Sequence, residues 1–173
     1  MERDGKNTLV AEDLAVAVLS ACRTSGLMIA TAESCTGGLI AAALTDISGS
    51  SDVVERGFVT YSNTAKHEML GVPENMIATK GAVSKDVAIA MAEGALENSR
   101  ADIAVAVTGV AGPSGGSETK PVGLVHLAVA YVNHPTVHIE RRFGSIGREQ
   151  IRHRTVQAGL QLILDQLADQ VRG

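Results

Sequence analysis

Residues 103–107 form an uninterrupted run of apolar side chains, and this run limits the possible folds more than any other segment. A strand with one wet face alternates apolar and polar residues, whereas a continuous apolar run is typical of a central strand covered on both faces. We therefore expect the rest of the chain to supply covering layers on both sides of a sheet.

The rest of the chain alternates between helical and extended patterns. The helical segments are residues 8–23, a stretch ending near residue 44, a short helix carrying Lys66, residues 84–98 and residues 148–171. The extended segments are residues 27–32, 53–61, 124–132 and 137–143, of which the last pairs with its predecessor as a half-exposed hairpin. This order favours an α/β fold, a three-layer α/β/α sandwich with a mixed, mostly parallel β-sheet.

Length and composition indicate one globular domain. The chain has 173 residues, 45% of them apolar and 20% charged, which is the balance of an ordinary domain with its own core. No internal repeat or linker divides it. We expect residues 1–173 to form a single domain, with residues 1–7 flexible.

Charge and aromatic content argue against several classes of partner. The net charge is −4 and only 2% of the residues are aromatic, which predicts no binding to nucleic acid or to anionic membranes. The two cysteines and the absence of a signal-peptide pattern predict a cytoplasmic protein. The five histidines form no metal-ligand pattern, so neither a metal nor another cofactor is expected.

Ser34 is the most informative candidate for chemistry. It lies between a predicted buried strand and a predicted helix, where unpaired backbone N–H groups could stabilise an oxyanion. Gly37 and Gly38 follow it and would let a substrate approach the backbone. The alternative is that Ser34 only caps the helix and that the glycines only relieve packing.

Lys66 is the candidate base for that serine. It follows the predicted strand end at Tyr61 and a cluster of capping residues, Ser62, Asn63 and Thr64. Because the carboxyl ends of parallel strands meet at one sheet edge, Lys66 could lie near Ser34, where burial would favour its neutral amine. The alternative is a solvated helix lysine.

A glycine-rich loop at residues 109–122 follows the most apolar strand, where ligands of α/β sheets bind. Its N–H groups could bind a phosphate, although it matches neither the Walker loop nor G-x-G-x-x-G, and a flexible connection is the alternative. Arg148 and Arg152 near the start of the last helix are candidate clamps for a phosphate or carboxylate, or else part of a solvated face.

The sequence closely resembles the CinA C-terminal domain family, the nicotinamide-nucleotide amidases. The matching stretches follow the family's order and span essentially the whole chain: residues 31–38 (TAESCTGG), 56–63 (RGFVTYSN) with Lys66, 81–84 (GAVS), 108–113 (TGVAGP), Gly116 and 120–123 (KPVG). The chain is similar to the stand-alone form, without the molybdopterin-binding-like domain of longer CinA proteins.

The resemblance implies hydrolysis of the carboxamide of nicotinamide mononucleotide to nicotinate mononucleotide and ammonia, in pyridine-nucleotide salvage. The family's catalytic serine and lysine fall on Ser34 and Lys66, which implies a Ser-Lys dyad acting through an acyl-enzyme. The residues expected to bind the substrate are Glu33, Cys35, Thr36, Gly37, Gly38, Tyr61, Thr108, Gly109, Gly112 and either Arg148 or Arg152.

Three questions stay open at this point. Cys35 competes with Ser34 as the nucleophile, because a thiolate is intrinsically more nucleophilic. A catalytically silent nucleotide-binding module, or an accessory role in competence or DNA damage, is the alternative function. Beyond the small-molecule substrate, the expected partner is a further copy of the chain in a homo-oligomer.

Overall fold

The computed structural model describes residues 5–172, with side chains described for residues 11–172. Five strands form one sheet in the order β2-β1-β3-β4-β5. Their bounds are β1 Ile29–Glu33, β2 Val54–Val59, β3 Ile103–Gly109, β4 Leu124–Tyr131 and β5 Val137–Arg142. β1 pairs in parallel with both β2 and β3, whereas β4 pairs antiparallel with both β3 and β5. The predicted mixed sheet is confirmed, with as many antiparallel as parallel pairings.

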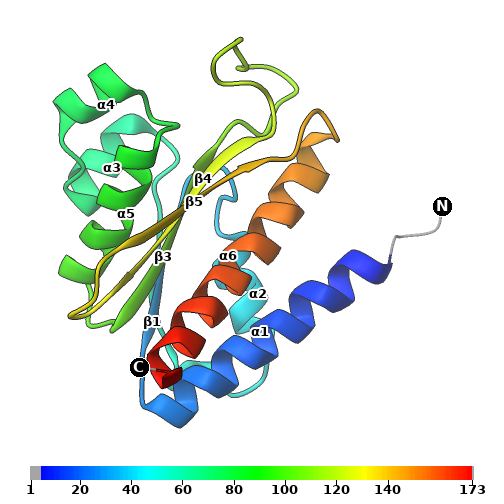
Figure 1. Ribbon diagram of the computed structural model, residues 1–173, viewed down its shortest axis with the longest axis vertical. Helices are drawn as coiled ribbons and strands as arrows, with labels where there is room; N and C mark the ends of the chain where they lie inside the picture. Colours follow the sequence, from blue (N-terminus) through cyan, green and yellow to red (C-terminus); the bar gives the residue numbers. More distant parts are fainter. Residues whose placement is uncertain (1–4, 173) are drawn as a thin grey trace.

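Three helices cover each face of the sheet, so the predicted α/β/α sandwich is confirmed (Figure 1). On one face lie α1 (Gly5–Ser25), α2 (Leu39–Thr45) and α6 (Arg148–Arg172). On the other face lie α3 (Asn63–Leu70), α4 (Glu74–Lys80) and α5 (Lys85–Glu97). Residues 1–4, which belong to the segment expected to be flexible, lie outside the described residues, and α1 begins within that segment at Gly5.

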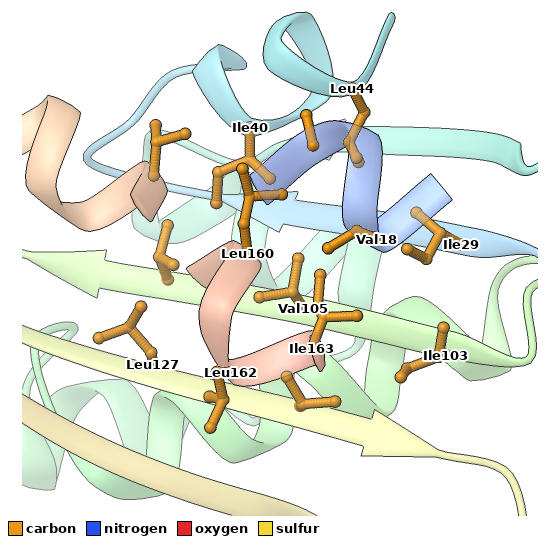
Figure 2. Packing of buried hydrophobic residues seen from close by; sticks show 14 of the residues in the cluster. Val18, Ile29, Ile40, Leu44, Ile103, Val105, Leu127, Leu160, Leu162 and Ile163 are labelled. Atoms are coloured by element: carbon orange, nitrogen blue, oxygen red, sulfur yellow. The ribbon is translucent and has the colours of Figure 1, made fainter. Parts of the chain in front are cut away.

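The apolar run in β3 serves both layers. Ile103, Val105 and Val107 are fully buried towards α1, α2 and α6. Figure 2 shows Ile103 and Val105 among Ile40, Leu160 and other branched side chains. The alternate residues Ala104 and Ala106 are buried towards α5. Large side chains therefore fill the first interface, while small ones let α5 approach the sheet closely.

Two helix caps position the second layer, of which the one at Ser62 was predicted. Ser62 Oγ accepts a hydrogen bond from Ala65 N at 3.0 Å, and Ser84 Oγ accepts one from Val87 N at 3.3 Å. These bonds satisfy N–H groups that a helix leaves free in its first turn. The cap at Ser62 starts α3 directly after β2, which fixes where Lys66 lies.

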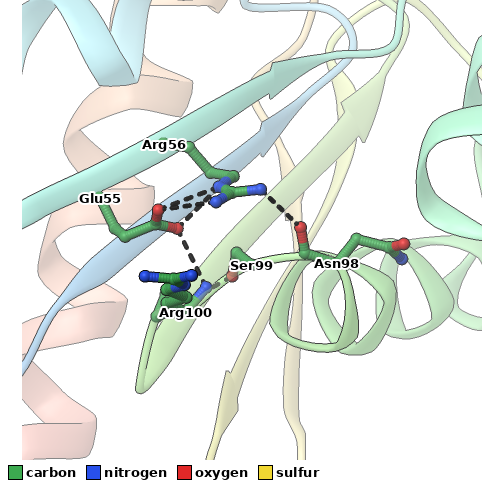
Figure 3. A network of polar contacts seen from close by, with 6 residues as sticks. Glu55, Arg56, Asn98, Ser99 and Arg100 are labelled. Atoms are coloured by element: carbon green, nitrogen blue, oxygen red, sulfur yellow. Dashed lines mark hydrogen bonds and ion pairs between the residues drawn. The ribbon is translucent and has the colours of Figure 1, made fainter.

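A polar network fastens the start of the edge strand β2 to the end of α5 (Figure 3). Arg56 donates to the carbonyl of Asn98 at 3.0 Å, and the Glu55 carboxylate accepts from Arg100 N at 3.1 Å. Glu55 and Arg56 also form an ion pair at 2.8 Å. The network lies at the amino end of β2, opposite the end from which the chain leads to Lys66.

Candidate active site

The candidate nucleophile lies directly beyond the carboxyl end of β1. Ser34 N donates to Val107 O of β3 at 3.1 Å, and Thr60 N, after β2, donates to Glu33 O at 2.9 Å. The hydrogen-bond ladder thus continues past the last strand residues on both sides of β1. These bonds hold the backbone of Ser34 between its two neighbouring strands.

Ser34 and Lys66 come together as the sequence predicted. Ser34 Oγ lies 2.9 Å from Lys66 Nζ, which also donates to Thr60 O at 2.9 Å and lies 3.4 Å from Tyr61 O. Lys66 is only 1% exposed and Ser34 8% exposed. Lys66 is therefore not a solvated helix lysine.

Burial controls the charge of the lysine. Removal from water lowers the pKa of Lys66, because desolvation disfavours the charged ammonium. No carboxylate forms an ion pair with it among the residues that the structure describes. A neutral amine at hydrogen-bond distance from a hydroxyl can act as a general base.

Cys35, the competing nucleophile, is in an environment that suppresses its thiolate. Its side chain is 4% exposed, and burial raises the pKa of the Cys35 thiol to about 12. A protonated buried thiol is a weak nucleophile. The local electrostatics therefore favour Ser34 over Cys35 at this turn.

A pocket of about 280 Å³ opens beside the Ser34–Lys66 pair. Of the predicted site residues, it is lined by Ser34, Cys35, Tyr61, Lys66, Thr108, Gly109, Gly112 and Arg148. Four further lining residues belong to the glycine-rich loop predicted at residues 109–122, namely Val110, Ala111, Ser114 and Gly115, whereas Asn63, Ala82 and Val83 were not predicted as site residues. A larger hollow of about 340 Å³ between α1, α2 and α6 lies elsewhere and has mainly apolar walls.

Arg148 joins two walls of this pocket. Its guanidinium donates to Tyr61 Oη and to Gly112 O, each at 2.8 Å, so it links the end of β2 to the glycine-rich loop. Tyr61 is 58% exposed, with its ring available to a ligand. A cation and an aromatic ring at a pocket mouth can bind an anionic group and a planar ring.

Thr108 and the segment it holds form another wall. Thr108 Oγ1 donates to Ala82 O at 2.8 Å, which brings the connection between α4 and α5 against the end of β3. Because this bond uses the proton of Thr108, the hydroxyl has no second proton for an oxyanion. The chemistry of the residues around Ala82 does not mark it as a site residue. Its place in the family-like GAVS stretch at residues 81–84 is the signal that could have found it.

The remaining predicted residues lie behind the pocket rather than in its wall. The buried Glu33 carboxylate accepts hydrogen bonds from Thr36 Oγ1 at 2.6 Å, Ile40 N at 2.8 Å and Ala41 N at 3.1 Å. Gly37 and Gly38 have φ of 58° and 105°, which glycine adopts without strain. Glu33 therefore fastens α2 to the end of β1, and the glycines allow the turn between them.

Arg152 also lies behind this turn. Its Nε donates to Cys35 O and its second terminal nitrogen to Thr36 O, both at 3.1 Å. Arg152 is not among the residues that line the pocket. The sequence could not distinguish the two arginines, but the structure does. Arg148 lines the pocket, whereas Arg152 binds the backbone of the turn.

Within residues 5–172, no group of three or more histidine, cysteine or acidic side chains is placed to hold a metal ion. The helices described there also include none with the length and apolarity that a membrane crossing requires.

Comparisons with known proteins place this geometry in a family. The model of the CinA C-terminal domain matches residues 11–167. A nicotinamide-nucleotide amidohydrolase PncC of Escherichia coli K12 is 48% identical over 146 residues, which cover 84% of this chain and 88% of that protein. A putative competence-damage inducible protein of Caldicellulosiruptor bescii is 49% identical over 143 residues, covering 83% of this chain and 34% of that protein.

A solved structure shares the fold closely. The competence/damage inducible protein CihA of Agrobacterium tumefaciens superposes with a TM-score of 0.89 at 56% identity, covering 90% of this chain and 94% of that one. The chain spans about a third of the length of longer relatives such as the C. bescii protein. With the family match over most of its length, the chain belongs to the CinA C-terminal domain family.

Proposed function

We propose that the protein hydrolyses the carboxamide of nicotinamide mononucleotide, giving nicotinate mononucleotide and ammonia. The observation that carries the proposal is the 2.9 Å contact between Ser34 Oγ and a buried Lys66 Nζ at the wall of a pocket. The E. coli relative named nicotinamide-nucleotide amidohydrolase, of which the chain covers 88%, supports the choice of substrate.

Acylation uses the dyad directly. Neutral Lys66 accepts the hydroxyl proton of Ser34 as Ser34 Oγ bonds to the carboxamide carbon, and the carbonyl oxygen becomes an oxyanion. Backbone N–H groups of the turn after Ser34 stabilise this oxyanion. The C–N bond then breaks, Lys66 returns the proton to the leaving nitrogen, and ammonia departs from an ester of Ser34.

Deacylation repeats the sequence with water. Lys66 accepts a proton from water as the water oxygen bonds to the ester carbon. Collapse of the second tetrahedral intermediate breaks the bond to Ser34 Oγ, which recovers its proton from Lys66. The acid product leaves and the dyad returns to its starting protonation state, so no cofactor is required.

The pocket walls give the rest of the substrate its partners. The exposed Tyr61 ring can stack on the pyridine, and the Arg148 guanidinium can exchange its neutral partners, Tyr61 Oη and Gly112 O, for a phosphate. A charged acceptor binds the guanidinium more strongly than a neutral one. Tyr61→Ala should therefore raise KM, and an unchanged KM would exclude stacking.

Ammonia release tests the proposal. The purified protein should release ammonia from nicotinamide mononucleotide, and Ser34→Ala should abolish the release, while Ser20→Ala on the exposed face of α1 should not. Full activity of Ser34→Ala would remove Ser34 from the nucleophile's role. Binding of the nucleotide without ammonia release would instead support a silent binding module.

A further inference from the structure

We propose that Arg152 is a positioning residue, which holds the backbone of the turn after Ser34 from behind, so that the N–H groups of Cys35 and Thr36 face the oxyanion. The proposal rests on Ser34 acting as the nucleophile in the proposed function. Its basis is the pair of hydrogen bonds, both at 3.1 Å, from one guanidinium to Cys35 O and Thr36 O. These carbonyls belong to the Cys35–Thr36 and Thr36–Gly37 peptides. Arg152 holds the Ser34–Cys35 peptide only indirectly, because Gly37 N donates to Ser34 O at 3.1 Å.

Peptide geometry links the held carbonyls to the free amides. In a trans peptide the C=O and the following N–H point in opposite directions. Since Cys35 O faces Arg152, the N–H of Thr36 points away from Arg152. The N–H of Gly37 also faces away from it and donates to Ser34 O at 3.1 Å, which closes the turn.

The turn leaves donors without acceptors. Within residues 5–172, the backbone N–H groups of Cys35 and Thr36 donate to no backbone carbonyl, and that of Cys35 contacts only its own Sγ. Both residues are almost completely buried, at 4% and 0% exposure, and a buried donor without an acceptor is costly. An oxyanion forming on the carbon attacked by Ser34 would supply the missing acceptor.

The charge of Arg152 acts in the same direction. Its guanidinium stabilises negative charge at the turn. It also lowers the pKa of the Cys35 thiol, although burial raises that pKa by more. Hydrogen bonds to the two carbonyls also polarise their peptides and strengthen the N–H donors. A lysine at this position could hold only one of the two carbonyls in fixed geometry, because it lacks the planar fork of arginine.

Packing against the turn restricts the conformations of the Arg152 side chain. A Cβ atom on Gly37 would lie 3.4 Å from the terminal nitrogen of Arg152, so the guanidinium lies directly against the turn. The pocket is lined instead by Arg148, four residues earlier on α6. Arg152 therefore supports the turn, while Arg148 is available to the substrate.

The test compares Arg152→Lys and Arg152→Met with Arg154→Met, which removes an exposed arginine from the same helix. For both Arg152 variants we expect kcat to fall about 10- to 100-fold, since removal of one oxyanion donor costs about 100- to 1,000-fold. KM should stay within about twofold of the wild-type value, because the bound substrate contacts the pocket wall that carries Arg148 and not Arg152 itself. Arg154→Met should match the wild type in both constants.

A transition-state mimic separates positioning from folding. The aldehyde analogue of nicotinamide mononucleotide forms a hemiacetal with Ser34 whose oxygen occupies the oxyanion site. Its affinity should fall by the same factor as kcat, whereas the affinity for nicotinate mononucleotide should not change. A rise in KM with unchanged kcat would make Arg152 a substrate ligand, and equal losses of aldehyde and product affinity would make it merely structural; either result overturns the proposal.

A probe that does not need the nucleotide separates this proposal from the substrate assignment. A fluorophosphonate reacts when Ser34 Oγ bonds to phosphorus, fluoride leaves and Lys66 takes the hydroxyl proton, and mass spectrometry locates the adduct. Labelling of Ser34 should slow by a similar factor in the Arg152 variants, even if nicotinamide mononucleotide were not the substrate. Equal labelling rates in wild type and variants, or no labelling of wild-type Ser34, would overturn the positioning role.

Discussion

Replacing Lys66 by methionine should stabilise the protein in a pH-dependent way. The lysine is 1% exposed, and its burial lowers the pKa of the ammonium from the ordinary value of 10.5. Folding at neutral pH must therefore either bury a charge or remove a proton, and methionine has a similar volume without this cost. The same substitution removes the proposed base, so Lys66→Met should be inactive.

The sign follows from proton linkage. Between the lowered folded-state pKa of Lys66 and 10.5, the unfolded chain holds one proton more than the folded protein, so the unfolding free energy of the wild type rises with pH. The slope for one proton is about 1.4 kcal/mol per pH unit. The stability advantage of Lys66→Met should shrink by that amount for each pH unit within this range.

Lys66→Met also loses hydrogen bonds, which lowers its stability by an amount that does not change with pH. The change of the stability difference with pH is therefore unaffected. Methionine cannot donate to Thr60 O or contact Ser34 Oγ, which costs about 0.5–1.5 kcal/mol for each bond. The absolute difference at one pH is therefore a weaker test than its change with pH.

Urea unfolding of both proteins at several pH values from about 7 to 10 measures this difference. Lys85→Met controls for the loss of a positive charge at an exposed position. A stability difference that stays constant over the whole range would refute the reasoning, because Lys66 would then hold the same proton in both states.

Three further outcomes follow from other features. The value of kcat/KM should rise with pH as buried Lys66 loses its proton, with a midpoint below 10.5, and a profile that falls over that limb would exclude a neutral lysine base. Burial raises the pKa of Cys22 to about 11 and that of Cys35 to about 12, so a thiol reagent near pH 8 should label both only on unfolding, and Cys35→Ala should retain activity. Gly94→Ala should cost about 3 kcal/mol or more in thermal unfolding, because its Cβ would overlap Leu70 O of α3, while Gly115→Ala, with open space around it, should cost about 1 kcal/mol.

The sequence predicted what depends on order along the chain. Strand ends, caps and the apolar run are local patterns, and parallel strands β1 and β2 bring their carboxyl ends together whatever the details of packing. That is why Ser34 and Lys66 could be paired before any coordinates were known.

What depends on tertiary register could not be predicted in this way. Arg148 and Arg152 are one helical turn apart, and only the packing of α6 against the sheet decides which of them faces the pocket. The pairing of β4 with β5 brings His126 Nδ1 within 2.9 Å of His138 Nε2, and the spacing of these residues in the sequence does not indicate this contact. The lining by Ala82 likewise depends on where α4 and α5 are joined in space.

The position of β2 at the edge of the sheet means that the segments carrying Ser34 and Lys66 differ in local stability. Ser34 follows β1, which has a hydrogen-bonded partner on each side, whereas Lys66 follows β2, which has a partner on one side only. Opening of β2 and α3 would carry Lys66 away from Ser34 while β1, β3 and β4 stay paired. The polar network at the other end of β2 opposes this opening. Amide hydrogen exchange should therefore be faster in β2 than in β1 and β3, and the proposed activity should be lost on heating before the central strands unfold.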